Sequence, residues 1–125
     1  MTRVSDRFLQ LAVLLALVGM GLGIGMGISQ NFQLQPVHAH INLLGWVSMT
    51  LYGLVYRVVP KAAEGRLPTV HFWLGAVSSV AMMALLAVEA SGLASIVPVL
   101  GVAALGVWLS VALFAVIVFR ATWRA

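Results

Sequence analysis

Two histidines separated by a single residue, His38 and His40, stand at the start of a long apolar stretch of the chain. No charged side chain follows them before Arg57. An imidazole is costly in hydrocarbon unless it has a partner, and it is a common ligand of metal ions and of haem iron. The pair therefore indicates a metal or haem site at one boundary of an apolar segment.

The spacing of the two histidines separates them in space. Residues two apart on an α-helix differ in direction by about 200°, so the two rings face opposite sides and cannot chelate one ion. The side of His38 continues through a mixed set of residues, Asn42, Gly45, Met49, Tyr52 and Tyr56. The side of His40 continues through an aliphatic set, Leu44, Val47, Leu51 and Val55. Two cofactors, or one cofactor and one hydrogen bond, both fit this pattern.

The elements that position these residues are membrane-spanning helices. The chain has 125 residues, of which 62% are hydrophobic and 8% charged, with a mean hydropathy of +1.09. This composition excludes an ordinary soluble domain. A span needs roughly 20 apolar residues, and four stretches qualify: 8–28, 37–59, 70–90 and 95–119. We expect one all-α domain over residues 1–125, an integral membrane four-helix bundle with antiparallel neighbours joined by short loops.

The basic residues predict the orientation of this bundle. They occur only at the N-terminus, in the loop after the second span and at the C-terminus: Arg3, Arg7, Arg57, Lys61, Arg66, Arg120 and Arg124. By the positive-inside rule, both termini should be cytoplasmic in a bacterial-type inner membrane. This distribution follows topology and does not indicate nucleic-acid binding. The first span is too long for a signal-peptide core and lacks a small-residue cleavage site after it, so we expect it to be retained.

Two further titratable residues are weaker candidates for the site. Glu89 lies near the outer end of the third span, as a solvated boundary residue or as a group approaching the histidines, and we favour the first reading. His71, with Phe72 and Trp73, opens the third span on the cytoplasmic side, where an interfacial aromatic belt is expected. His71 and His40 lie about one span length apart, so they cannot share one iron within a chain.

Composition also limits the chemistry and the packing. The chain has no cysteine, which excludes disulfides, thiolate ligation of haem, iron–sulfur clusters and covalent c-type haem attachment. The first span ends in overlapping G-x-x-x-G registers between Gly19 and Gly27. Glycines at this spacing allow close helix packing, which we favour over a groove for a flat cofactor. They also offer a surface where copies of the chain could meet.

The second span resembles part of haem–copper oxidase subunit I, most of all its nitric-oxide-reductase-like branch. The residues that carry the resemblance are His40, Asn42-Leu43-Leu44, Trp46, Gly53, Tyr56 and Val59-Pro60. The family's helix II carries a low-spin haem ligand where His40 stands here, and its helix X carries an H-x-H pair similar to His38-Ala39-His40. The family's twelve helices form three arcs of four, so the resemblance implies one such arc standing alone.

This resemblance implies a small membrane b-type cytochrome, with haem b held by His40 and with His38 as the other ligand candidate. No further histidine cluster for copper is present, so the chain lacks the ligands of a binuclear centre, and enzymatic activity stays open. A second axial ligand must come from another copy, which predicts a homo-oligomer, a trimer by the arc analogy. The role would be electron transfer, haem sensing or haem handling, with respiratory-chain partners. The alternatives are a membrane protein binding copper or zinc without haem, and a structural accessory subunit of a respiratory complex.

Overall fold

The computed structural model describes residues 3–123, whose regular structure is entirely helical. Three helices are long and apolar enough to cross a membrane: α1 (Val4–Ser29), α4 (Leu67–Ala90) and α5 (Val97–Thr122). Between α1 and α4, α2 (Gln35–His40), the π-helix η1 (Ile41–Ser48) and α3 (Met49–Val58) follow without a break. The backbone stays right-handed helical at both junctions. Residues 35–58 therefore form one rod, called the α2–α3 helix below.

The four rods begin and end within a few residues of the stretches expected from hydropathy. Three of them have a proline in the first turn, Pro36, Pro68 and Pro98, where the missing N–H costs no intrahelical hydrogen bond. The largest difference is at the start of α1, which begins four residues early, at Val4. There the backbone N–H of Arg3 donates to the Asp6 carboxylate. This polar first turn extends the helix beyond its apolar stretch.

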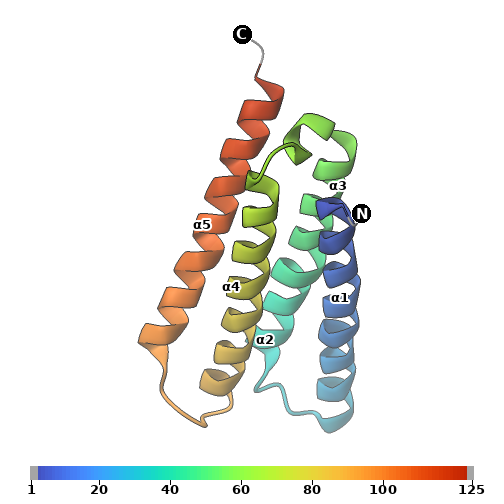
Figure 1. Ribbon diagram of the computed structural model, residues 1–125. Helices are drawn as coiled ribbons and strands as arrows, with labels where there is room; N and C mark the ends of the chain where they lie inside the picture. Colours follow the sequence, from blue (N-terminus) through green and yellow to red (C-terminus); the bar gives the residue numbers. More distant parts are fainter. Residues whose placement is uncertain (1–2, 124–125) are drawn as a thin grey trace.

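The rods run side by side and alternate in direction (Figure 1). The short helix η2 (Pro60–Ala63) and both ends of the described chain lie at one end of the molecule, and the loops 30–34 and 91–96 lie at the other. All the basic residues in the described part occur at the η2 end: Arg3, Arg7, Arg57, Lys61, Arg66 and Arg120. Arg124 lies outside the described residues. The fold thus gathers the positive charge at one end, as the predicted topology requires.

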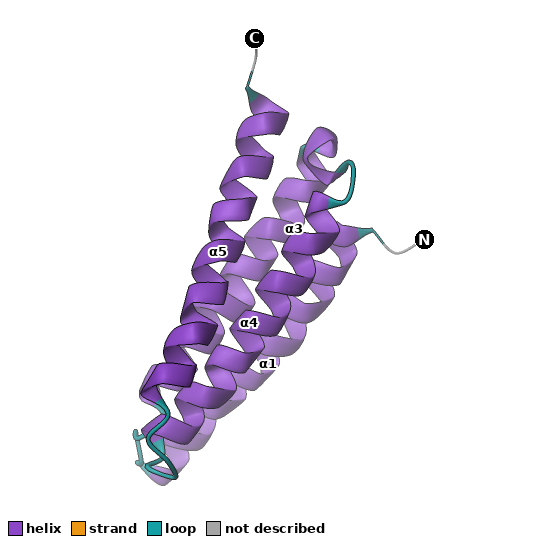
Figure 2. Ribbon diagram, turned by 60° about the vertical axis from the view of Figure 1, so that its left-hand side comes forward, coloured by secondary structure: helices purple, strands orange, loops and turns teal. Residues whose placement is uncertain are grey.

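Close packing between α1 and the α2–α3 helix depends on glycines. A Cβ at Gly45 would lie 2.9 Å from Leu15, and one at Gly53 would lie 2.8 Å from Leu9. The main apolar core lies towards the η2 end, and a smaller cluster of Val37, Ile41 and Met83 lies towards the other. α5 packs mainly on α4 and also contacts η2, and it lies at the left edge of the bundle in Figure 2.

Candidate functional site

His38 is held in the interface between α2 and α1. Its Nδ1 lies 2.7 Å from the carbonyl oxygen of Gly19. A carbonyl oxygen only accepts, so Nδ1 carries the proton, and in the neutral ring Nε2 keeps a lone pair. The amide of Asn42 donates to the backbone carbonyl of His38, at 3.1 Å. His38 therefore links α2 to α1 through a hydrogen bond.

His40 points away from that interface and is only partly buried. Its Nδ1 lies 2.7 Å from the carbonyl oxygen of Pro36, one turn earlier in the same helix. The ring therefore donates through Nδ1 and keeps an unprotonated Nε2. Metal-ligating histidines almost always donate their other ring nitrogen in this way, because the bond fixes the tautomer and the ring orientation. The neighbouring surface is aliphatic and exposed at Val47 and Leu51.

The π-helix η1 begins directly after His40, which the sequence patterns did not predict. π segments are rare and occur frequently at functional sites. Here the hydroxyl of Ser48 donates to the carbonyl of Leu43, five residues earlier, at 2.8 Å. The buried positions follow a spacing of four through this region, at Val37, Ile41, Gly45 and Met49. A regular α-helix would turn this set by about 40° at each step, and the wider turns of η1 keep it facing the bundle.

The glycines at the end of α1 belong to two different surfaces. A Cβ at Gly19 would lie 2.7 Å from Oδ1 of Asn42, and one at Gly23 would lie 2.7 Å from Cε1 of His38. Gly19 and Gly23 form an inward register, which confirms the close helix packing expected from the sequence. It also corrects the idea that Gly23 lies where copies of the chain meet, because that position is filled by His38. Gly21 and Gly25 have no atom within 4 Å of an added Cβ, so they form the outward register.

Glu89 is a boundary residue that serves the loop before α5. Its Oε2 accepts a hydrogen bond from the backbone N–H of Ile96, at 2.7 Å. Ile96 is the N-cap residue of α5, and a carboxylate there is favoured by the free N–H groups of a helix start. In the described part of the chain Glu89 makes no hydrogen bond to a histidine. The alternative, in which Glu89 approaches the histidines of the second span, is therefore not seen.

His71 corrects the sequence interpretation most clearly. It was expected at the membrane interface, and the structure encloses it completely, with 0% exposure. Aromatic rings from the other three rods surround it: Phe8 of α1, Tyr52 and Tyr56 of α3, and Phe114 of α5. The Tyr56 hydroxyl lies 2.8 Å from its Nδ1, and its Nε2 has no hydrogen-bond partner in the described residues.

A signal for this burial is present in the sequence. The buried positions of α4 include His71, Gly75 and Ser79, which recur every four residues and place the imidazole on the buried side of the helix. Of the three residues expected in an aromatic belt, His71 and Phe72 are buried and Trp73 is exposed. Small residues at Gly75, Ala76 and Ser79 follow His71 on the inner face of α4, which also carries the buried Phe72 and Met83.

Comparison with protein-family models, with curated proteins and with solved structures finds no match to this chain. The chemistry of the site is therefore read from its own residues. Within residues 3–123 no three His, Cys, Asp or Glu side chains lie together as a set that could hold a metal ion. What one chain offers is a single outward imidazole at His40, a second imidazole held between helices at His38, and an enclosed imidazole at His71.

Proposed function

We propose that this protein is a small membrane haem b protein in which His40 is an axial ligand. In this proposal the α2–α3 helix is the fourth membrane-spanning helix, and the four rods form a membrane bundle that resembles one arc of haem–copper oxidase subunit I. The bundle would lie in a bacterial-type inner membrane with both termini in the cytoplasm. The proposal rests on the residues of the second span and on the geometry of His40.

The orientation of the His40 ring is the observation that supports haem ligation best. Nδ1 is engaged with the carbonyl of Pro36 at 2.7 Å, so Nε2 is the nitrogen left for iron. The ring leaves the bundle beside exposed aliphatic side chains, among them Leu43 and Val47. Apolar side chains of this kind suit the body of a porphyrin. Bound haem would supply a one-electron couple, for a role in electron transfer, haem sensing or haem handling.

One chain fits one axial ligand and no more. The two pockets at the ends of the bundle are lined by other residues than histidine, so the macrocycle would lie against the outer surface of the α2–α3 helix. Its far side then needs a wall and a ligand from another copy, namely His38 or His40 of that copy. We therefore propose a homo-oligomer, with a ring of three copies favoured by the arc resemblance.

The direct test is an absorption spectrum of the purified protein in detergent, first oxidised and then reduced with dithionite. We expect a Soret band that shifts on reduction, and we expect His40→Ala to abolish it or shift it strongly. Leu105→Ala is the control, since Leu105 is an exposed apolar residue of α5, 55% exposed, and lies outside the surface beside His40. A colourless protein with stoichiometric copper would instead favour the alternative of a membrane protein that binds copper without haem. A spectrum unchanged in His40→Ala would contradict the ligand assignment.

A further inference from the structure

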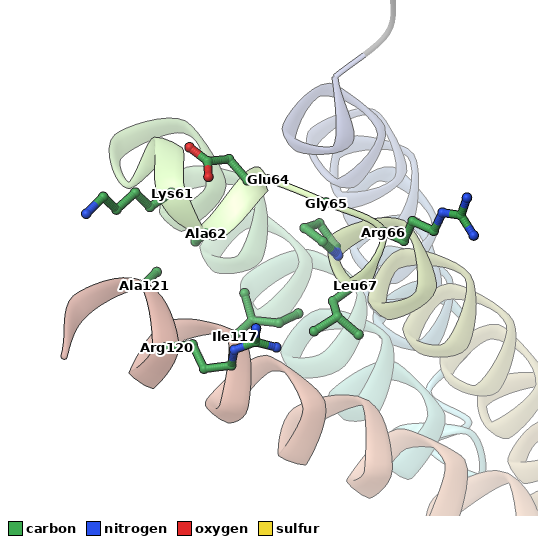
Figure 3. A pocket seen from close by; sticks show the side chains of 10 residues that line it. Lys61, Ala62, Glu64, Gly65, Arg66, Leu67, Ile117, Arg120 and Ala121 are labelled. Carbon is green, nitrogen blue, oxygen red and sulfur yellow. The ribbon is translucent and has the colours of Figure 1, made fainter.

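A pocket with a positive rim lies at the η2 end of the bundle, far from His38 and His40. It has a volume of about 500 Å³ and lies between η2, the start of α4 and the last turns of α5. Figure 3 shows these three segments around it, with the Arg120 side chain turned into the space beside Ile117.

The charge of this pocket is unbalanced. Lys61, Arg66 and Arg120 line it, and Glu64 is the single carboxylate among its lining residues. The only ion pair in the described residues joins Arg57 to Asp6, outside the pocket. The three cations of the pocket are therefore without a carboxylate partner in the described part of the chain. The start of α4 also lines the pocket, and the free backbone N–H groups there add partial positive charge.

The walls of the pocket combine this charge with apolar surface. Leu67 and the buried Ile117 line it beside the cations. Below Arg120 on α5, the side chains of Val116 and Phe119 are exposed, at 50% and 63%. Val116 lies four residues before Arg120 and so shares its face of the helix. Exposed apolar surface of α5 thus lies within one helical turn of the cationic pocket.

We propose that this pocket binds the phosphate headgroup of an anionic phospholipid. Arginine pairs with phosphate through two parallel hydrogen bonds, and Arg120 is turned into the pocket for this. Lys61 and Arg66 also line the pocket, with side chains that point outward in Figure 3 and add to its positive charge. The acyl chains then run along α5 beside Val116 in the bilayer. Basic pockets between membrane helices on the cytoplasmic side bind anionic headgroups, and the apolar half of this site distinguishes a lipid from a free phosphate.

The test uses the full-length protein, purified in mild detergent and mixed with phosphatidylglycerol or phosphatidylcholine, with retained lipid counted by native mass spectrometry. We expect phosphatidylglycerol to be retained in preference to phosphatidylcholine. Arg120→Gln should lower its retention at least about fivefold, the scale of one lost charge-assisted contact. Arg7→Gln is the matched control, because Arg7 lies at the same end of the molecule and outside the pocket, and it should retain lipid as the parent does.

Three results would overturn the proposal: equal retention of the two lipids, unchanged retention in Arg120→Gln, or displacement of the lipid by millimolar inorganic phosphate, which would indicate a free-anion site. The double variant Lys61→Gln with Arg66→Gln changes only exposed side chains. It decides the question if Arg120→Gln does not fold, and it should also lose preference for the anionic lipid. None of these measurements depends on haem.

Discussion

The hydroxyl oxygen of Tyr56 lies 2.8 Å from Nδ1 of His71, and this contact joins the end of α3 to the first turns of α4 inside the core. Both side chains are buried, Tyr56 at 3% exposure and His71 at 0%. The ring of Phe114 from α5 stacks on the imidazole with centroids 5.1 Å apart, and Phe8 of α1 lies against it at 5.0 Å. His71 is therefore the point at which all four rods meet.

Removing the Tyr56 hydroxyl should destabilise the bundle. In Tyr56→Phe both nitrogens of the buried His71 lack a partner, and an unsatisfied buried polar group costs about 1–3 kcal/mol. Thermal unfolding in detergent, followed by circular dichroism, should show a lowered midpoint. The double variant Tyr56→Phe with His71→Phe removes both polar partners and should recover much of the loss. Equal losses in the single and double variants would mean that the hydrogen bond contributes nothing.

Much of this architecture follows from the sequence, and the reason differs from one part to another. The rods follow from hydropathy, because the bilayer length sets the length of each apolar stretch. The opposite directions of His38 and His40 follow from helical spacing alone. The π-helix η1 does not, since the set of residues at spacing four that it keeps facing the bundle is recognised only once their burial is known. The enclosure of His71 likewise depends on rings supplied by three other rods, which hydropathy does not record.

The glycines of α1 should respond to substitution according to their register. Gly23→Ala places a Cβ 2.7 Å from Cε1 of His38, so the imidazole must shift, and overpacking of this kind costs about 1–3 kcal/mol. Gly21→Ala meets no atom within 4 Å and should leave the unfolding midpoint unchanged or raise it slightly. The two midpoints, measured in the same detergent, test the packing of His38 against α1. Equal effects at the two positions would contradict it.

The predicted topology can be tested with reporter fusions. Because the basic residues gather at the η2 end, a reporter fused after Ala125 should be active as a cytoplasmic fusion. The same reporter inserted between Gln30 and Gln35, in the loop at the other end of the molecule, should give the opposite reading. Identical readings at the two sites would contradict the four-span assignment, and with it the outer placement of His40.

The final prediction is that haem binding depends on assembly. His40 presents one ligand on the outside of the bundle, so a six-coordinate haem needs a second copy to supply the other ligand and the other wall. Native mass spectrometry should therefore detect an oligomer, expected to be a trimer, that contains haem. Gly21→Leu, on the outward register of α1, should weaken assembly and lower haem content together, because glycines at this spacing permit close approach of helices. Gly101→Leu is the matched control, because Gly101 on α5 likewise has no atom within 4 Å of an added Cβ but lies off this register, and it should preserve both. A monomer with a full complement of six-coordinate haem would refute the shared-ligand arrangement and leave a protein with its ligands in one chain.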